Sequence, residues 1–207
     1  MTLPNLLTIL RIILAPVVLA LLRFEGLFFR CASLVVFVIA ALTDWYDGRM
    51  ARKLGRVSKL GNFLDPLADK ILVLLTFFAF AWYGHVAVWM VVVIAGRDLL
   101  ITALRVYAAW KRQPIVTSAS AKWKTASQMA AIYLIMIYLI ALEYLPRLEG
   151  PAWLLETDWA RAIHLMMQAV TFITIATAVQ YLVENRRHLR SLALACLRVL
   201  APGNLAK

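Results

Sequence analysis

Charged residues are scarce in this chain of 207 residues, since only 16% of them are Asp, Glu, Lys or Arg. An ordinary soluble domain carries about 25% charged residues. The hydrophobic share is correspondingly high at 63%, and the mean hydropathy is +0.79. The composition excludes an ordinary soluble domain and predicts a membrane protein.

Cysteine is scarce as well. The two cysteines, Cys31 and Cys196, lie toward opposite ends of the chain, one in an apolar segment and one near the C-terminus. A disulfide framework needs several cysteines at regular spacing, and a cysteine metal site needs them in close groups. The sequence therefore indicates neither class of site.

Six apolar stretches divide the chain, each long enough to cross a bilayer, which takes about 20 residues. They cover residues 4–23, 31–52, 61–83, 86–110, 120–144 and 159–184. We predict an all-α fold, a polytopic membrane bundle of six transmembrane helices, in one catalytic domain of residues 1–184. Residues 185–207 form a basic cytoplasmic tail, which is either an amphipathic helix in the headgroup plane or a frayed end.

Basic residues gather in alternate loops. The segments 49–59 and 105–124 each carry five basic residues and no acid, the tail carries five more, and residues 143–161 carry four acids against two bases. Since Lys and Arg resist translocation, we place both termini and the two basic loops on the cytoplasmic side of the inner membrane. The formal net charge of +11 then suits anionic headgroups, and we expect no nucleic-acid partner.

Four aspartates flank the first basic loop. Asp44 and Asp47 lie near the end of the second stretch, and Asp65 and Asp69 near the start of the third. Carboxylates at membrane depth are costly, and they are typical of functional sites. Spacings of three and four residues put each pair on one face of its helix. If the two helices are neighbours, the four carboxylates converge.

A converging carboxylate cluster needs compensating positive charge. Oxygen ligands without Cys or His nearby favour Mg²⁺, Mn²⁺ or Ca²⁺ over zinc. The alternative is a salt-bridged cytoplasmic rim with the neighbouring basic residues. Gly48, Ala51 and Gly61 favour the metal site, because these small residues clear a helical face beside the acids for a ligand.

The segment Asp44–Lys70 reads DWYDGRMARKLGRVSKLGNFLDPLADK. It contains D-x-x-D-G-x-x-A-R, eight residues, then G-x-x-x-D-x-x-x-D, and at every defined position it resembles the CDP-alcohol phosphatidyltransferase family. Three outer segments, PNLLTILRI at 4–12, GRDLLITALR at 96–105 and SAKWKTASQM at 120–129, are similar to the bacterial phosphatidylglycerophosphate synthases.

The resemblance implies a homodimer that transfers the phosphatidyl group of CDP-diacylglycerol to sn-glycerol 3-phosphate in phospholipid biosynthesis and releases CMP. It implies two divalent ions, Mg²⁺ or Mn²⁺, and a proton acceptor, Asp69. The implied metal ligands are Asp44, Asp47, Asp65 and Asp69. The implied CDP-lipid site consists of Asp44, Gly48, Ala51, Arg52, Ser58 and Gly61.

Four cations outside this motif are candidates for binding a phosphate on the acceptor. They are Arg97, Arg105, Lys122 and Lys124. Fixed guanidinium and ammonium groups suit a phosphomonoester, which favours glycerol 3-phosphate over a neutral alcohol. The alternatives are cytoplasmic anchoring for Arg105 and the two lysines, and a local pair with Asp98 for Arg97.

Other functions remain open at this point. The same transferase chemistry would serve another acceptor, such as an inositol phosphate, phosphatidylglycerol or serine. A membrane cation transporter could also place four acids at the mouth of a helix bundle. A conduction path, however, needs polar residues across the whole membrane depth, whereas these acids cluster near one face.

Overall fold

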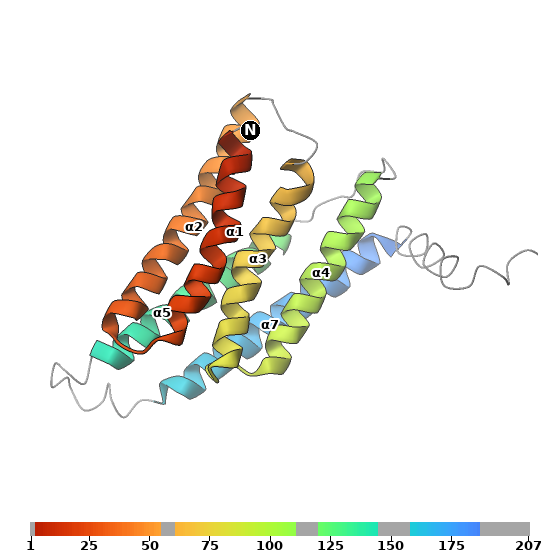
Figure 1. Ribbon diagram of the computed structural model, residues 1–207. Helices are drawn as coiled ribbons and strands as arrows, with labels where there is room; N and C mark the ends of the chain where they lie inside the picture. The colour runs from red at the N-terminus through yellow and green to blue at the C-terminus, as the bar shows by residue number, and fades with distance from the viewer. Residues whose placement is uncertain (1–2, 55–60, 111–119, 145–157, 187–207) are drawn as a thin grey trace, which may run out of the picture.

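The computed structural model describes residues 3–54, 61–110, 120–144 and 158–186 (Figure 1). Within these ranges only the backbone is described for residues 3–8, 44–54, 61–69, 107, 109–110 and 120–122. The described residues form α-helices and no strand, which confirms the all-α prediction. The helices are α1 (Leu3–Arg23), α2 (Leu27–Leu54), α3 (Gly61–Trp82), α4 (Val88–Trp110), α5 (Ser120–Tyr144) and α7 (Trp159–Glu184). These bounds match the six apolar stretches closely, except that α2 begins earlier, at Leu27.

The helices pack around one main apolar core. α1 packs against both α2 and α3, α5 packs against α2, α3 and α7, and α4 packs against α3 and α7. The buried side chains of α5 recur at helical spacing, as Ile132, Ile135, Met136 and Leu139 do. They meet Phe37 of α2 and other core residues through one face of α5. This packing brings α3, α4, α5 and α7 together around the site described below.

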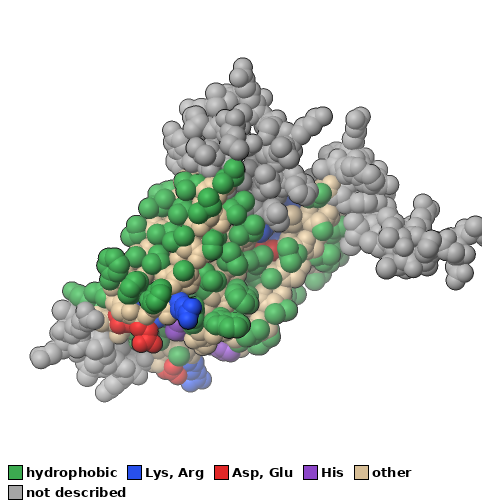
Figure 2. Space-filling model, viewed as in Figure 1, with side chains coloured by type: hydrophobic (Ala, Val, Ile, Leu, Met, Phe, Trp, Pro, Cys, Tyr) green, Lys and Arg blue, Asp and Glu red, His purple; other side chains and the backbone are tan. Residues whose placement is uncertain are grey.

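Large apolar side chains also cover the outside of the bundle. Phe28 is 76% exposed, Phe172 is 72% exposed, and exposed residues of this kind occur on every described helix. Figure 2 shows hydrophobic side chains over most of the face in view, with most of the visible charged and His side chains at its lower end. Such continuous exposed apolar surface is typical of contact with lipid.

Two helices of the described part are long and apolar enough to cross a membrane, namely Trp123–Tyr144 in α5 and Trp159–Glu184 in α7. The apolar parts of α2 and α3 with described side chains, Leu27–Thr43 and Lys70–Trp82, are shorter. The apolar sequence of the continuous helix α4 is interrupted by the charged residues Arg97, Asp98 and Arg105. Six membrane crossings therefore stay a prediction.

The turn from α3 to α4 is built on a glycine. The N–H of Gly84 donates to the carbonyl of Ala81, and the N–H of His85 donates to the carbonyl of Phe80. This pair of bonds is the Schellman motif, and it needs the left-handed φ of +78° that Gly84 adopts. His85 itself is half-buried in the turn, where burial and the charge of Arg30 lower its pKa. His85 therefore stays neutral at neutral pH.

We predict that Gly84→Ala lowers the free energy of unfolding by about 1–2 kcal/mol, because an L side chain is strained at a left-handed φ. An added Cβ meets nothing within 4 Å at this position, so the loss comes from backbone strain alone. Thermal unfolding in detergent, followed by circular dichroism, measures the change.

The matched control is Gly96→Ala in α4. An added Cβ at Gly96 also meets nothing within 4 Å, and the φ there is not in the left-handed region. Gly96→Ala is expected to cause no loss of stability. Equal losses in the two variants would show that the strain at Gly84 has no measurable effect.

Candidate functional site

The helix ends that carry the four aspartates lie at the same end of the bundle (Figure 1). Asp44 and Asp47 belong to α2, and Asp65 and Asp69 belong to α3. Both helices continue past these residues without a break, which agrees with the predicted pairing at helical spacing. The side chains of the four aspartates lie outside the described residues.

Other predicted residues of this region also lie outside the described side chains. Gly48, Ala51 and Arg52 are in the last turns of α2, and Gly61 is the first residue of α3. Ser58 falls in the connection between these helices, and Lys122 falls in the first turn of α5. The structure places their helices but describes no side-chain contact of theirs.

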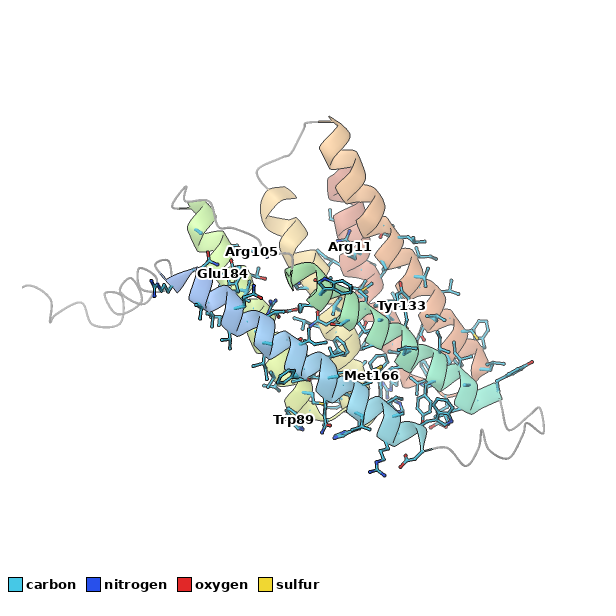
Figure 3. All side chains as sticks on the ribbon, turned by 180° about the vertical axis from the view of Figure 1, so that it is seen from behind. Arg11, Trp89, Arg105, Tyr133, Met166 and Glu184 are labelled. Atoms are coloured by element: carbon cyan, nitrogen blue, oxygen red, sulfur yellow. The ribbon has the colours of Figure 1, made fainter. Side chains whose placement is uncertain are left out.

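Arg11 is a charged side chain buried in α1, with only 2% of its surface exposed. The helix α1 packs against both α2 and α3, the two helices that carry the aspartates. Figure 3 shows Arg11 on the part of α1 toward this end of the bundle. In the sequence Arg11 is a single charged residue within the first apolar stretch, which does not reveal its direction. Its burial shows that the side chain faces the interior of the bundle.

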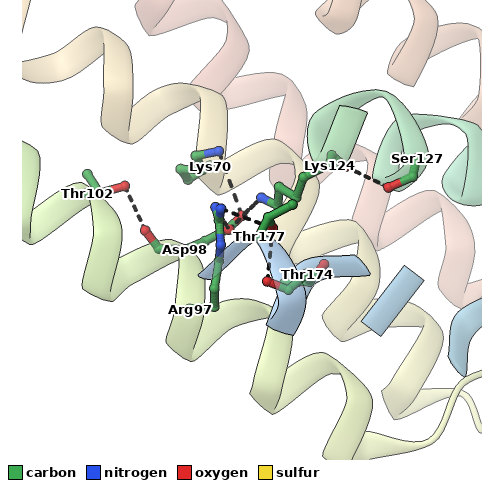
Figure 4. A network of polar contacts seen from close by, with 8 residues as sticks. All are labelled: Lys70, Arg97, Asp98, Thr102, Lys124, Ser127, Thr174 and Thr177. Carbon is green, nitrogen blue, oxygen red and sulfur yellow. Dashed lines mark hydrogen bonds and ion pairs between the residues drawn. The ribbon is translucent and has the colours of Figure 1, made fainter. Parts of the chain in front are cut away.

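Asp98 of α4 lies at the centre of the polar network that the structure describes (Figure 4). Its carboxylate is fully buried, and the buried ammonium group of Lys124 on α5 donates to both of its oxygens. The guanidinium of Arg97 lies 3.1 Å from one oxygen, and the ammonium of Lys70 on α3 lies 3.7 Å from the other. One carboxylate thus holds three cations from three helices.

The fourth helix, α7, reaches this network through threonine. Arg97 Nη2 donates to the hydroxyl of Thr177 at 3.4 Å, and that hydroxyl donates to the carbonyl of Thr174 at 3.0 Å. The Arg97 guanidinium is therefore held from two sides, by Asp98 within α4 and by Thr177 of α7. Its position is defined more closely than that of a solvated arginine.

Arg105 lies eight residues after Arg97, about two helical turns further along α4. Its guanidinium carbon is 5.8 Å from the ring centroid of Tyr181 on α7, within the range of a cation–π contact. Tyr181 packs with Ile101 and Leu104 of α4 in a second small apolar cluster. Arg97 and Arg105 thus both contact α7, which agrees with a separation of eight residues, about 80° around the helix. Arg105 remains exposed, which leaves its guanidinium accessible to a ligand.

The described cations carry more charge than the one carboxylate among them. Counted formally, Lys70, Arg97 and Lys124 supply three positive charges and Asp98 supplies one negative charge, so the formal net charge of the four groups is +2. Among the described residues no group of three or more His, Cys, Asp or Glu side chains could hold a metal ion. The described network therefore suits an anion.

The sequence identified some of these residues and missed others. It identified Arg97 and Lys124 as acceptor-phosphate candidates, and the structure brings these two together on Asp98. The pair of Arg97 with Asp98, considered above as an alternative, is present in the structure. The role of Asp98 as a shared partner was missed, although an acid at membrane depth beside an arginine was the available signal.

The comparisons with known proteins agree on one family. Residues 1–199 match the family model described as CDP-alcohol phosphatidyltransferase. The chain is 36% identical to CDP-diacylglycerol–glycerol-3-phosphate 3-phosphatidyltransferase 2 of Arabidopsis thaliana, over 65% of this chain and 64% of that relative. It is 33% identical to the Cereibacter sphaeroides protein called CDP-diacylglycerol–glycerol-3-phosphate 3-phosphatidyltransferase, over 78% of this chain and 74% of the relative. A Pseudomonas fluorescens protein of the same description is 30% identical over 92% of this chain and 93% of its own length.

We predict that Asp98→Asn costs about 3–5 kcal/mol of stability, because removing one partner leaves buried cations without their counter-charge. The double variant Asp98→Asn with Lys124→Met is expected to lose less than the sum of the two single changes. Thermal unfolding of all four proteins in detergent gives the coupling energy. Additive losses would show that the two side chains do not depend on each other.

Proposed function

Because this chain belongs to the CDP-alcohol phosphatidyltransferase family, we propose that it transfers the phosphatidyl group of CDP-diacylglycerol to sn-glycerol 3-phosphate. The products are phosphatidylglycerophosphate and CMP, and the reaction belongs to phospholipid biosynthesis. The main support is the full aspartate pattern from Asp44 to Asp69. Relatives named for this activity match as much as 92% of the chain.

The family is divalent-metal dependent, and the aspartates of this chain fit that requirement. Their carboxylates form an all-oxygen donor set, which is the set that Mg²⁺ and Mn²⁺ prefer. We assign Asp44, Asp47, Asp65 and Asp69 as the ligands of two such ions. When bound, the ions supply positive charge to the phosphoryl oxygens and to the leaving CMP.

Asp69 is the proton acceptor in this proposal. The hydroxyl oxygen of glycerol 3-phosphate bonds to the phosphorus that carries diacylglycerol, and the diphosphate bond to CMP breaks. The hydroxyl proton passes to the Asp69 carboxylate. The donor occupies the end of α2 and the start of α3, with a CDP-lipid site formed by Asp44, Gly48, Ala51, Arg52, Ser58 and Gly61.

The phosphate of the acceptor binds to cations on α4 and α5. Arg97 and Lys124 already share one buried site, and Arg105 is held over Tyr181 with its guanidinium exposed. Lys122 lies in the first turn of α5, two residues before Lys124. Charge-assisted hydrogen bonds from such groups favour a phosphomonoester over a neutral alcohol.

The lipid donor requires a membrane location. Two apolar helices and membership of a family of membrane enzymes indicate membrane association. We extend this to six crossings of the inner membrane, with both termini and the active site on the cytoplasmic side, and to a homodimer. The exposed apolar side chains on every described helix support contact with lipid or with a second copy.

We predict that the purified protein releases CMP when it is incubated with CDP-diacylglycerol, Mg²⁺ and glycerol 3-phosphate. Parallel reactions with serine, an inositol phosphate, phosphatidylglycerol and plain glycerol identify the acceptor class. CMP release with one of those acceptors and not with glycerol 3-phosphate would replace the proposed acceptor. An absence of CMP release with all of them would contradict the transferase proposal.

The proton-acceptor assignment is tested in the same assay with Asp69→Asn. The amide cannot take up the hydroxyl proton, so turnover is expected to fall by a factor of about 10²–10⁴. Metal occupancy is measured in parallel by mass spectrometry of the bound ions. Near-normal turnover at unchanged occupancy would remove Asp69 from the role of proton acceptor.

We predict that Arg105→Ala raises the KM for glycerol 3-phosphate about tenfold, because a charge-assisted hydrogen bond is worth about 1.5–3 kcal/mol. The KM for CDP-diacylglycerol is expected to stay unchanged. The control is Arg161→Ala. Arg161 is also exposed, and it lies in the first turn of α7, whereas Tyr181, the partner of Arg105, lies near the last turn. Equal increases in both KM values would assign Arg105 to general structural support.

A further inference from the structure

The feature that the proposed function leaves unexplained is the acid at the centre of the cationic site. A negative charge beside a phosphate weakens phosphate binding, yet Asp98 is fully buried between Lys70, Arg97 and Lys124. A structural ion pair needs one cation for one acid, whereas this acid has three. Its surroundings therefore indicate more than a structural pair.

We propose that Asp98 is a positioning residue, which assembles Lys70, Arg97 and Lys124 into one preformed binding site for the phosphate of the acceptor. This inference rests on the proposed function, since it concerns the acceptor of the same reaction. It adds Lys70 and Asp98 to the residues that determine acceptor binding.

Electrostatics explains why such an assembly needs an acid. Three positive charges on three helices repel one another, and lysine side chains are flexible enough to turn toward water when nothing holds them. The carboxylate of Asp98 keeps the two ammonium groups and the guanidinium together before the ligand arrives. Binding then costs less ordering of side chains, which is the benefit of preorganisation.

The remaining charge fits a phosphomonoester. The formal net charge of the four groups is +2. A phosphomonoester carries about −1.5 to −2 near neutral pH. A phosphomonoester therefore offsets this charge, whereas a neutral alcohol leaves the excess positive charge uncompensated.

Unpaired polar atoms around the network also point to a ligand. Among the described residues Arg97 Nε, Gln128 Nε2, Thr174 Oγ1 and Tyr181 Oη are buried and find no hydrogen-bond partner. Gln128 lies one helical turn from Lys124, and Thr174 and Tyr181 lie about one turn on either side of Thr177. Buried polar groups in folded proteins are rarely unpaired, so these atoms, on residues in or within about one turn of the network, favour an anionic ligand at this site.

The network also connects the acceptor site to the metal-site helix. Lys70 directly follows Asp69 in α3, and its ammonium lies 3.7 Å from Asp98 of α4. This ion pair links the turn of α3 that carries Asp69 to the segment of α4 that carries Arg97. Asp98 thereby connects the proposed binding site of the acceptor phosphate to the part of α3 that carries Asp69, the proposed proton acceptor.

The test compares Asp98→Asn and Asp98→Glu with wild type in CMP-release kinetics. Asp98→Asn is expected to raise the KM for glycerol 3-phosphate about tenfold or more and to leave the KM for CDP-diacylglycerol unchanged. Asp98→Glu restores the charge and is expected to recover part of the loss. The control is Thr102→Val, which removes a hydroxyl bonded to the backbone carbonyl of Asp98 and changes no charge (Figure 4).

The sign of the change separates positioning from simple repulsion. If Asp98 only opposes the ligand, Asp98→Asn makes the site more positive and lowers the KM for glycerol 3-phosphate. A lowered or unchanged KM would therefore overturn the proposal. Equal increases in the KM for both substrates, or the same effect in Thr102→Val, would also overturn it.

A binding measurement keeps the test independent of turnover. Glycerol 3-phosphate is expected to raise the melting temperature of the wild-type protein in detergent, and glycerol is not. Asp98→Glu, the variant that retains the charge, should show a smaller shift, and Asp98→Asn should show none. Equal shifts in all three proteins would contradict the positioning role.

The two proposals fail in different ways. If wild type releases no CMP with any acceptor but glycerol 3-phosphate still stabilises it and not Asp98→Asn, the transferase proposal fails while the phosphate site stands. If CMP is released normally and Asp98→Asn leaves the acceptor KM unchanged, the inference about Asp98 fails alone.

Discussion

A charged group that leaves water for the interior of an apolar bundle costs several kcal/mol unless an opposite charge meets it, and this cost determines which helices of this protein must meet. Lys124 of α5 is almost completely buried, and so is Asp98 of α4. Neither could stay charged alone. Their contact, joined by Lys70 of α3 and by the link from Arg97 to Thr177 of α7, ties four helices together at one depth. The apolar core then fills the space between them.

The same constraint explains why the structure could be predicted from sequence to different degrees. The helices were predictable because each coincides with an apolar stretch of membrane-spanning length, bounded by charge or by glycine. The carboxylate pattern from Asp44 to Asp69 was also readable, since it lies within two consecutive helices and one short connection. The Asp98 network was not readable in this way. Its members lie on helices far apart in the chain, and only the packing of α4 against α3 and α7, and of α5 against α3 and α7, brings them together. The adjacent pair Arg97 and Asp98 was the one local sign of it.

The position of Arg105 shows how far periodicity alone can lead. Eight residues after Arg97, it lies about 80° from it around the helix, and both arginines contact α7. Their partners differ, however, because the side chains of α7 differ at the two levels. Arg97 meets the hydroxyl of Thr177, whereas Arg105 meets the ring of Tyr181. Helical spacing fixes the face of a residue, and the neighbouring helix decides whether it is buried and bonded or exposed and stacked.

The distribution of polar groups along the bundle argues against a conduction path. Away from the Asp98 network, the described core consists of side chains such as Phe37, Phe77, Phe80 and Met90. The buried hydroxyls in this part donate to carbonyls of their own helices, as Thr76 does to Leu72 and Ser33 does to Arg30. A transporter needs polar groups that face a pathway through the whole membrane depth. In the described residues the buried charged groups that contact one another gather around Asp98, in a network that includes Lys70, the residue after Asp69. One localised polar network suits transfer chemistry at a single site, where donor and acceptor can meet, better than it suits conduction.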